Sequence, residues 1–112
     1  SLFISKKDLT TNAVTTLYTV PSNSRAIVKA ILVSSDNGSA TTITVDLFDG
    51  DPAASAAKFT LFNVEAIAAN ESKQLLTEPL IMLEGEVLQV TAADANRLFA
   101  VASILEINRE DR

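Results

Sequence analysis

The densest group of side chains able to bind an ion consists of three closely spaced carboxylates, Asp46, Asp49 and Asp51. Calcium is held by several oxygen ligands that converge from a loop, so these three are the candidates for a metal site. Their spacing lacks the ligand pattern of an EF-hand and its closing Glu. The alternative is a solvated turn whose carboxylates accept local hydrogen bonds. We expect the turn, and therefore no metal or other cofactor.

The residue types that enzymes use most are missing. The chain contains neither Cys nor His, which excludes thiol nucleophiles and disulfides and removes the commonest general base. A pair of carboxylates such as Glu84 and Glu86 would hydrolyse a glycoside only at a suitable separation, and the chain has no Trp and only one Tyr on which a sugar could stack. We expect no enzymatic activity.

The charges are unfavourable for binding nucleic acid. Lys and Arg number 9 against 14 Asp and Glu, and the basic residues are scattered rather than gathered into a stripe. No run approaches the roughly 18 apolar residues that span a membrane. The first five residues lack the basic start and long apolar stretch of a signal peptide. We expect a protein made in a cytoplasm, with no membrane segment and no direct contact with nucleic acid.

Turn residues separate short runs rich in Val, Ile, Thr and Leu. This pattern predicts a single domain over residues 1–112, an all-β antiparallel sandwich of jelly-roll type with eight or nine short strands. Residues 1–12 would form an arm or an edge strand, and residues 108–112 a charged tail. The predicted strands are 2–5, 13–20, 25–34, 40–48, 58–64, 72–76, 80–83, 86–92 and 97–107.

Two local features give sharper expectations. Segment 40–48 alternates cleanly, with Ile43, Val45 and Leu47 on one side. The turn residues 36–39 before it predict a hairpin with 25–34, in which Gly38 takes a positive φ. Residues 53–58 are Ala-rich and form either a short helix capped by Asp51 or a loop.

Strands 25–34 and 97–107 are apolar on both sides, although a two-layer sandwich buries only one side of each sheet. We expect a partner to cover the second side, either another copy of the chain or another protein. The terminal Leu2 and Phe3 either add an edge strand or dock on a neighbour. Phe48, Phe59, Phe62 and Phe99 are predicted to lie in the core. The predicted interface candidates are Leu2, Phe3, Ile27, Ile31 and Val33.

Over residues 13–107 the chain resembles small β-sandwich virion proteins of tailed bacteriophages, of the capsid decoration, neck and tail accessory type. The segments that carry the likeness are LYTVP (17–21), AIVKAILVS (26–34), GSATTITV (38–45), IAANES (67–72) and LIMLEGEVLQVTA (80–92). In the last of these, the family often has Pro-Gly-Asp where this chain has Leu83-Glu84-Gly85-Glu86. The resemblance supplies no individual functional residues.

What the resemblance implies is a non-enzymatic part of a virion, foremost a capsid decoration (cement) protein bound to the major capsid protein, or else a neck or tail component. It also favours a homotrimer among the possible homo-oligomers. The alternative is a glycan- or receptor-binding module of a tail or fibre, which would use the loops 35–39, 49–57 and 92–97.

Overall fold

The computed structural model describes residues 1–108, and this part of the chain folds into nine β-strands and one short 3-10 turn. Residues 1–108 contain no helix with the length and apolar composition that a membrane-spanning helix requires. Of the predicted tail, residues 108–112, only Asn108 is among the described residues, and it is the last residue of β9. The elements are β1 (Leu2–Leu9), β2 (Val14–Thr19), β3 (Ser24–Ser35), β4 (Thr41–Phe48), η1 (Pro52–Ala54), β5 (Lys58–Ile67), β6 (Ser72–Gln74), β7 (Leu80–Met82), β8 (Val87–Ala92) and β9 (Leu98–Asn108).

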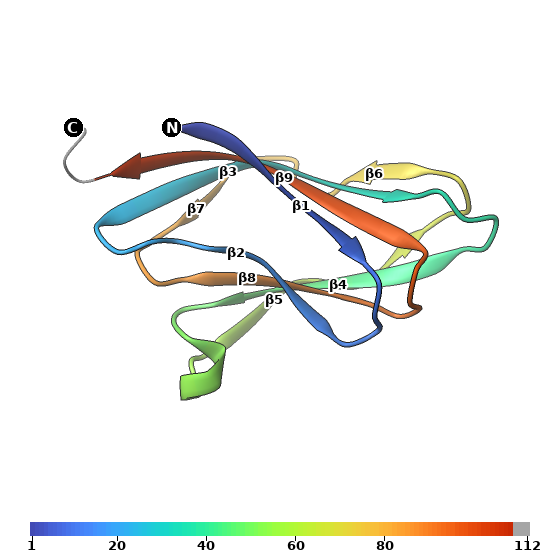
Figure 1. Ribbon diagram of the computed structural model, residues 1–112, viewed down its shortest axis with the longest axis horizontal. Helices are drawn as coiled ribbons and strands as arrows, with labels where there is room; N and C mark the ends of the chain where they lie inside the picture. The colour runs from blue at the N-terminus through green and yellow to red at the C-terminus, as the bar shows by residue number, and fades with distance from the viewer. Residues whose placement is uncertain (109–112) are drawn as a thin grey trace.

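The strands form two antiparallel sheets that lie one above the other (Figure 1). In the first, here called sheet A, the order is β1-β9-β3, and β6 and β7 pair with opposite ends of the free edge of β3. Sheet B has the order β2-β8-β4-β5. With β6 and β7 counted as one interrupted strand, this is the strand order of a jelly roll, in which the first strand lies beside the last. The predicted fold class is confirmed.

The predicted hairpin between 25–34 and 40–48 is wrong. β3 belongs to sheet A and β4 to sheet B, so the connection between them crosses from one layer to the other. It is tied to a neighbouring loop, since the Asn70 N–H donates to the Asn37 carbonyl at 3.0 Å. Gly38 does not adopt a positive φ, whereas Gly85, in the turn between β7 and β8, has a φ of 81°. Turn residues mark a change of direction, but they do not say whether the chain returns within its own sheet.

The core lies between the sheets and is formed by the alternate residues that point inward. In β4, Ile43 and Val45 are fully buried and Leu47 is partly buried against the core, so the three share the inward side as predicted. The phenylalanines follow the prediction less well. Only Phe62 of the four packs against the core, and Phe59 is 53% exposed on the edge strand β5. Phe48 and Phe99 lie at positions where the alternation of their strands directs the side chain outward.

The Ala-rich segment forms a single 3-10 turn rather than a two-turn helix. The Asp51 side chain caps it by accepting a hydrogen bond from the Ala53 N–H at 2.9 Å, and Pro52 is its first residue. Ser55 ends the turn in the left-handed conformation. The remainder of 49–57 is loop, so both alternatives proposed for this segment are correct in part.

Candidate interaction surface

The outer face of sheet A carries more apolar side chains than a solvated sheet face normally does. In β9 the inward residues Leu98, Ala100, Ala102 and Ile104 are buried. The residues between them are mostly apolar as well. The alternate apolar residues, which project to the outer face and are only partly buried, are Phe99, Val101, Leu105 and Ile107. The predicted two-sided character of this strand is therefore present in the structure.

β3 departs from its predicted alternation because it contains a β-bulge. Its pairing with β9 shifts between Val28 and Ala30, so Lys29 is an extra residue without a direct partner. One inserted residue reverses which side chains point inward beyond it. Ile31 and Val33 are consequently fully buried in the core, and the prediction that they share a face with Ile27 is wrong.

Three of the five predicted interface candidates do not lie on the outer face: Ile31 and Val33 are buried, and Phe3 points inward. The Phe3 ring lies 5.8 Å from the Tyr18 ring between the sheets and packs against the core. Leu2 and Ile27 stay on the outer face, and their role in an interface stays a prediction.

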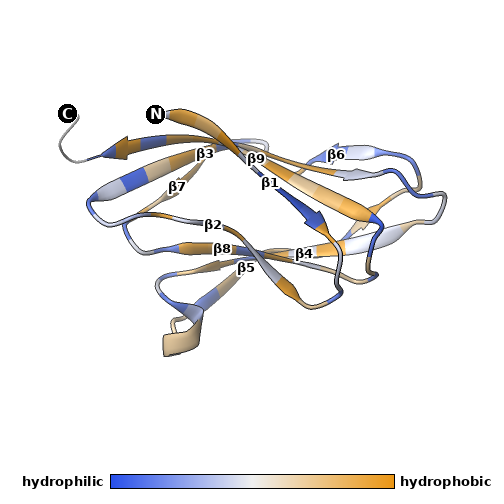
Figure 2. Ribbon diagram, viewed as in Figure 1, coloured by the Kyte–Doolittle hydropathy of each residue, from blue (hydrophilic) through white to orange (hydrophobic). Residues whose placement is uncertain are grey.

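Four strands of sheet A place an aliphatic residue at the same height on the outer face. Leu2 pairs with Leu105, Leu105 with Ile27, and Ile27 with Ile81, so these residues form one line across β1, β9, β3 and β7. We call this line the aliphatic row. Its two ends are the most open, with Leu2 68% and Ile81 65% exposed. Figure 2 shows the apolar character of the first half of β1 and of much of β9.

Further apolar side chains flank the aliphatic row. Ile4 on β1, at the next outward position from the row, is exposed, and Leu32 and Val101 are paired with each other at the outward position after that. Sequence reasoning missed Ile4 and Ile81 as surface residues. Exposure of Ile4 could have been anticipated from its alternation with Phe3, but Ile81 becomes part of the row only through its register with β3.

Few charges interrupt this face. The described residues that project charge from it are Lys6 and Asp8 on β1 and Arg25 and Lys29 on β3. Most of the other carboxylates of this acidic chain lie in the loops and on sheet B. The outer face of sheet A is therefore apolar at its centre and weakly basic around it.

The outer face of sheet B is polar at the corresponding place. Thr16, Gln89, Asp46 and Thr60 are register partners across its four strands. Gln89 Nε2 donates to Thr16 Oγ1 at 3.1 Å, and Thr60 Oγ1 donates to Asp46 Oδ1 at 2.6 Å. Since their hydrogen bonds are made within the sheet, these side chains need no partner from another molecule. The two outer faces thus differ in the kind of neighbour they favour.

The three candidate metal ligands are not brought together. Asp46 accepts from Thr60, whereas Asp49 Oδ1 accepts from the Ala57 N–H at 2.9 Å and Asp51 caps η1. Within residues 1–108 no group of three or more acidic side chains is arranged to hold a metal ion. Asp49 and Asp51 make the local hydrogen bonds expected of a turn, whereas Asp46 is buried in β4 and bonds across to Thr60 on β5.

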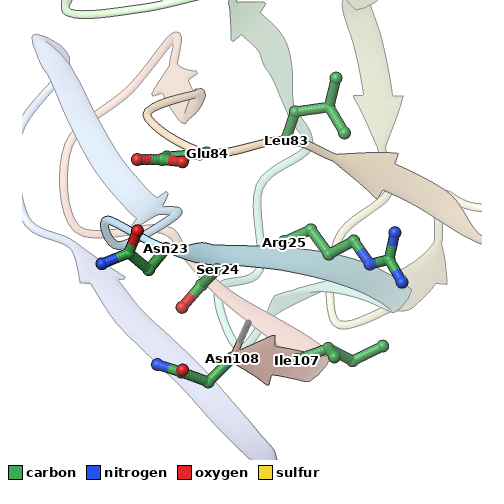
Figure 3. A pocket seen from close by; sticks show the side chains of 7 residues that line it. All are labelled: Asn23, Ser24, Arg25, Leu83, Glu84, Ile107 and Asn108. Carbon is green, nitrogen blue, oxygen red and sulfur yellow. The ribbon is translucent and has the colours of Figure 1, made fainter. Parts of the chain in front are cut away.

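A pocket of about 280 Å³ lies at one end of sheet A, where the β2–β3 and β7–β8 turns meet the end of β9. Asn23, Arg25, Glu84 and Ile107 are among its lining residues (Figure 3). Their side chains diverge, with Arg25 and Ile107 directed to one side of the pocket and Asn23 and Glu84 to the other. Such a mixed, divergent lining does not assemble a catalytic centre.

The loops considered for glycan binding are split between the two ends of the sandwich. Loops 35–39 and 92–97 share one end, where Thr41 Oγ1 donates to Asp94 Oδ2 at 2.6 Å and Arg97 forms an ion pair with Asp94 at 3.3 Å. Loop 49–57 lies at the opposite end (Figure 1). The three loops therefore cannot contribute to one binding site.

No family model matches the sequence, and no curated protein matches it. Solved structures do share the fold. A protein of the icosahedral IBDV viral particle aligns over 99% of this chain with a TM-score of 0.58 and 7% identity. A protein in the structure of infectious bursal disease virus strain Gx aligns over 99% of this chain with a TM-score of 0.52 and 10% identity. This chain spans about a third of their length, 32% and 31% respectively.

A pentameric capsid protein from metagenomic phage sequences also aligns over 99% of this chain and 64% of its own, at 15% identity, but its TM-score of 0.46 is too low to add weight. At identities this low, structural likeness shows a shared fold and nothing more. The jelly roll of this chain is thus a fold that a protein of a viral particle also has.

Proposed function

We propose that the chain is a non-enzymatic structural component of a virion. The observation that carries this proposal is a jelly roll, shared over its whole length with a virus-particle protein, that bears an exposed apolar row across one outer face. A contiguous apolar patch on a small domain marks a surface that contacts another protein. On the opposite face Gln89 and Thr60 donate to Thr16 and Asp46, and at one end Thr41 donates to Asp94, all inside the domain.

More specifically, we infer that the chain is a capsid decoration protein of a tailed phage and binds the major capsid protein. The alternative location in the particle is the neck or the tail. The sequence resemblance to tailed-phage virion proteins supports this finer assignment. A homotrimer rests on that resemblance alone, because nothing in the geometry of the sheets favours threefold packing.

The test is the composition of purified virions. Quantitative mass spectrometry should find the chain in many copies per particle, hundreds for a decoration protein and a few to dozens for a neck or tail part. Cryo-electron microscopy of particles carrying a tagged chain should then place it on the capsid shell. Abundance in infected cells without incorporation into particles would contradict a structural role.

The glycan- or receptor-binding alternative has weaker support because its candidate loops lie at opposite ends of the domain. A glycan array probed with the purified chain checks it. Specific binding that is lost on changing one loop would favour this alternative over the structural role.

A further inference from the structure

The aliphatic row is an apolar surface that no other part of the described chain covers. A sandwich of two sheets buries the inner face of each sheet, and an outer face normally alternates with polar side chains. Here Leu2, Leu105, Ile27 and Ile81 cross sheet A from one edge to the other with both ends more than half exposed. A flat apolar sheet face is best covered by another sheet, packed about 10 Å away with its strands nearly aligned.

A second copy of the same face fits this row. Consider a two-fold axis parallel to the strands and midway between β9 and β3, in the plane of the contact. It reverses the strand order and keeps the height, so Leu2 meets the partner's Ile81 and Leu105 meets the partner's Ile27. Every contact along the row then joins a Leu to an Ile, and each contact occurs twice, as a two-fold interface requires.

The charges on the face are compatible with the same axis. Arg25 is paired with Ile107 and would therefore meet the partner's Ile107. Lys6 lies at the height of Val101, Leu32 and Gln74, so it would meet the partner's Gln74. No cation lies directly opposite another cation in this register; Arg25 and Lys29, both on β3 beside the axis, each lie one strand away from their own symmetry mate. The basic side chains stay around the apolar centre.

The area is adequate for a modest affinity. From Phe99 to Ile107, β9 runs about 27 Å, and four strands at a spacing of about 4.8 Å are about 19 Å wide. A face of roughly 500 Å² on each copy gives a total of about 1,000 Å², the size of a weak or transient interface. Such an interface supports association at micromolar rather than nanomolar concentrations.

We propose that two copies of the chain associate face to face through the aliphatic row, about a two-fold axis parallel to the strands of sheet A. This pairing does not depend on the virion role and can be tested with the purified chain alone. It differs from the trimer favoured by sequence resemblance, and it assigns interface positions to Leu2, Ile27, Ile81 and Leu105.

The first test measures mass in solution. Sedimentation equilibrium at about 100 µM, a concentration suited to micromolar association, should give about twice the 11.9 kDa of one chain. Ile81→Lys should weaken association at least tenfold. Val14→Lys, at an apolar position of sheet B that is 54% exposed, should leave association unchanged. Circular dichroism confirms that both variants fold. A wild-type mass of 11.9 kDa, a trimer, or a dimer unaffected by Ile81→Lys would overturn the proposal.

The second test locates the axis by disulfide cross-linking. Because the chain contains no Cys, only the introduced cysteines can form a disulfide. Leu2→Cys mixed with Ile81→Cys should give a cross-linked dimer under mild oxidation, since these positions face each other in the pair. Leu2→Cys mixed with Val14→Cys should give several-fold less. Equal cross-linking in both mixtures would show that association does not use the aliphatic row, and would leave the proposed virion role untouched.

Discussion

Tyr18 Oη donates a hydrogen bond to Glu106 Oε2 across 2.6 Å and thereby connects the two sheets at the end that holds the N-terminus. Tyr18 lies on β2 of sheet B and Glu106 on β9 of sheet A. A bulge in β2 between Thr16 and Tyr18 turns the ring inward, where it is 8% exposed. The phenol therefore exchanges water for a carboxylate as its hydrogen-bond partner.

This arrangement predicts a loss of stability at alkaline pH. Burial, followed by the hydrogen bond and the charge of Glu106, raises the pKa of Tyr18 above its ordinary value of about 10. Because the folded state holds the phenolic proton more tightly, this contribution is complete below pH ~10 and declines as the pH rises above it. Urea unfolding between pH 8 and pH 11 should show the decline.

Tyr18→Phe is the control for that experiment. It removes the hydrogen bond and should lower the free energy of unfolding at pH 8 by about 1–2 kcal/mol. It should also flatten the part of the alkaline decline that Tyr18 causes. An identical slope in the variant and the wild type would mean that other groups determine the alkaline behaviour.

Gly85 is predicted to be the glycine that the fold needs for its backbone conformation. It is the third residue of the Leu83–Glu86 turn, closed by a 3.0 Å hydrogen bond from the Glu86 N–H to the Leu83 carbonyl. Its φ of 81° is one that residues with a Cβ rarely adopt. Gly85→Ala should cost about 1 kcal/mol of unfolding free energy. Gly38→Ala is the matched control and should be nearly neutral, because φ is ordinary there and the added Cβ meets open space.

Val64 is predicted to be a site of stored strain on the edge strand β5. Its φ is 51°, a left-handed value that is unfavourable for a β-branched residue, and its side chain is exposed. The Val64 N–H donates to Thr44 Oγ1 at 3.1 Å, which helps to hold this conformation. Val64→Asn should raise the free energy of unfolding by about 1 kcal/mol, since Asn tolerates this region. A lower melting temperature for the variant would contradict this account.

The carboxylates near β4 are predicted not to bind calcium. Asp49 and Asp51 each accept a backbone hydrogen bond, and Asp46 is turned toward Thr60. About 5 mM CaCl₂, enough to load even a weak extracellular-type site, should leave the melting temperature unchanged. A calcium-dependent increase that disappears in Asp49→Asn would show that the loop rearranges into a site.

Features that depend only on neighbouring residues could be predicted from the amino-acid sequence. Strict alternation in β4 predicted its buried face, the breaks between apolar runs predicted the strands, and the double apolar pattern of β9 predicted a face in need of a cover. These features are local, because side chains in an extended strand alternate whatever the strand pairs with. The absence of Cys and His likewise limited the chemistry directly.

The pairing of the strands depends on contacts between distant parts of the chain and could not be predicted from the sequence. The bulge at Lys29 arises in the pairing of β3 with β9, and it moved Ile31 and Val33 from the predicted interface into the core. The aliphatic row joins Leu2 to Leu105, far apart along the chain, through register alone. Register and bulges are set by contacts between distant strands, so a one-residue shift that no local pattern reveals determines which side chains reach the surface.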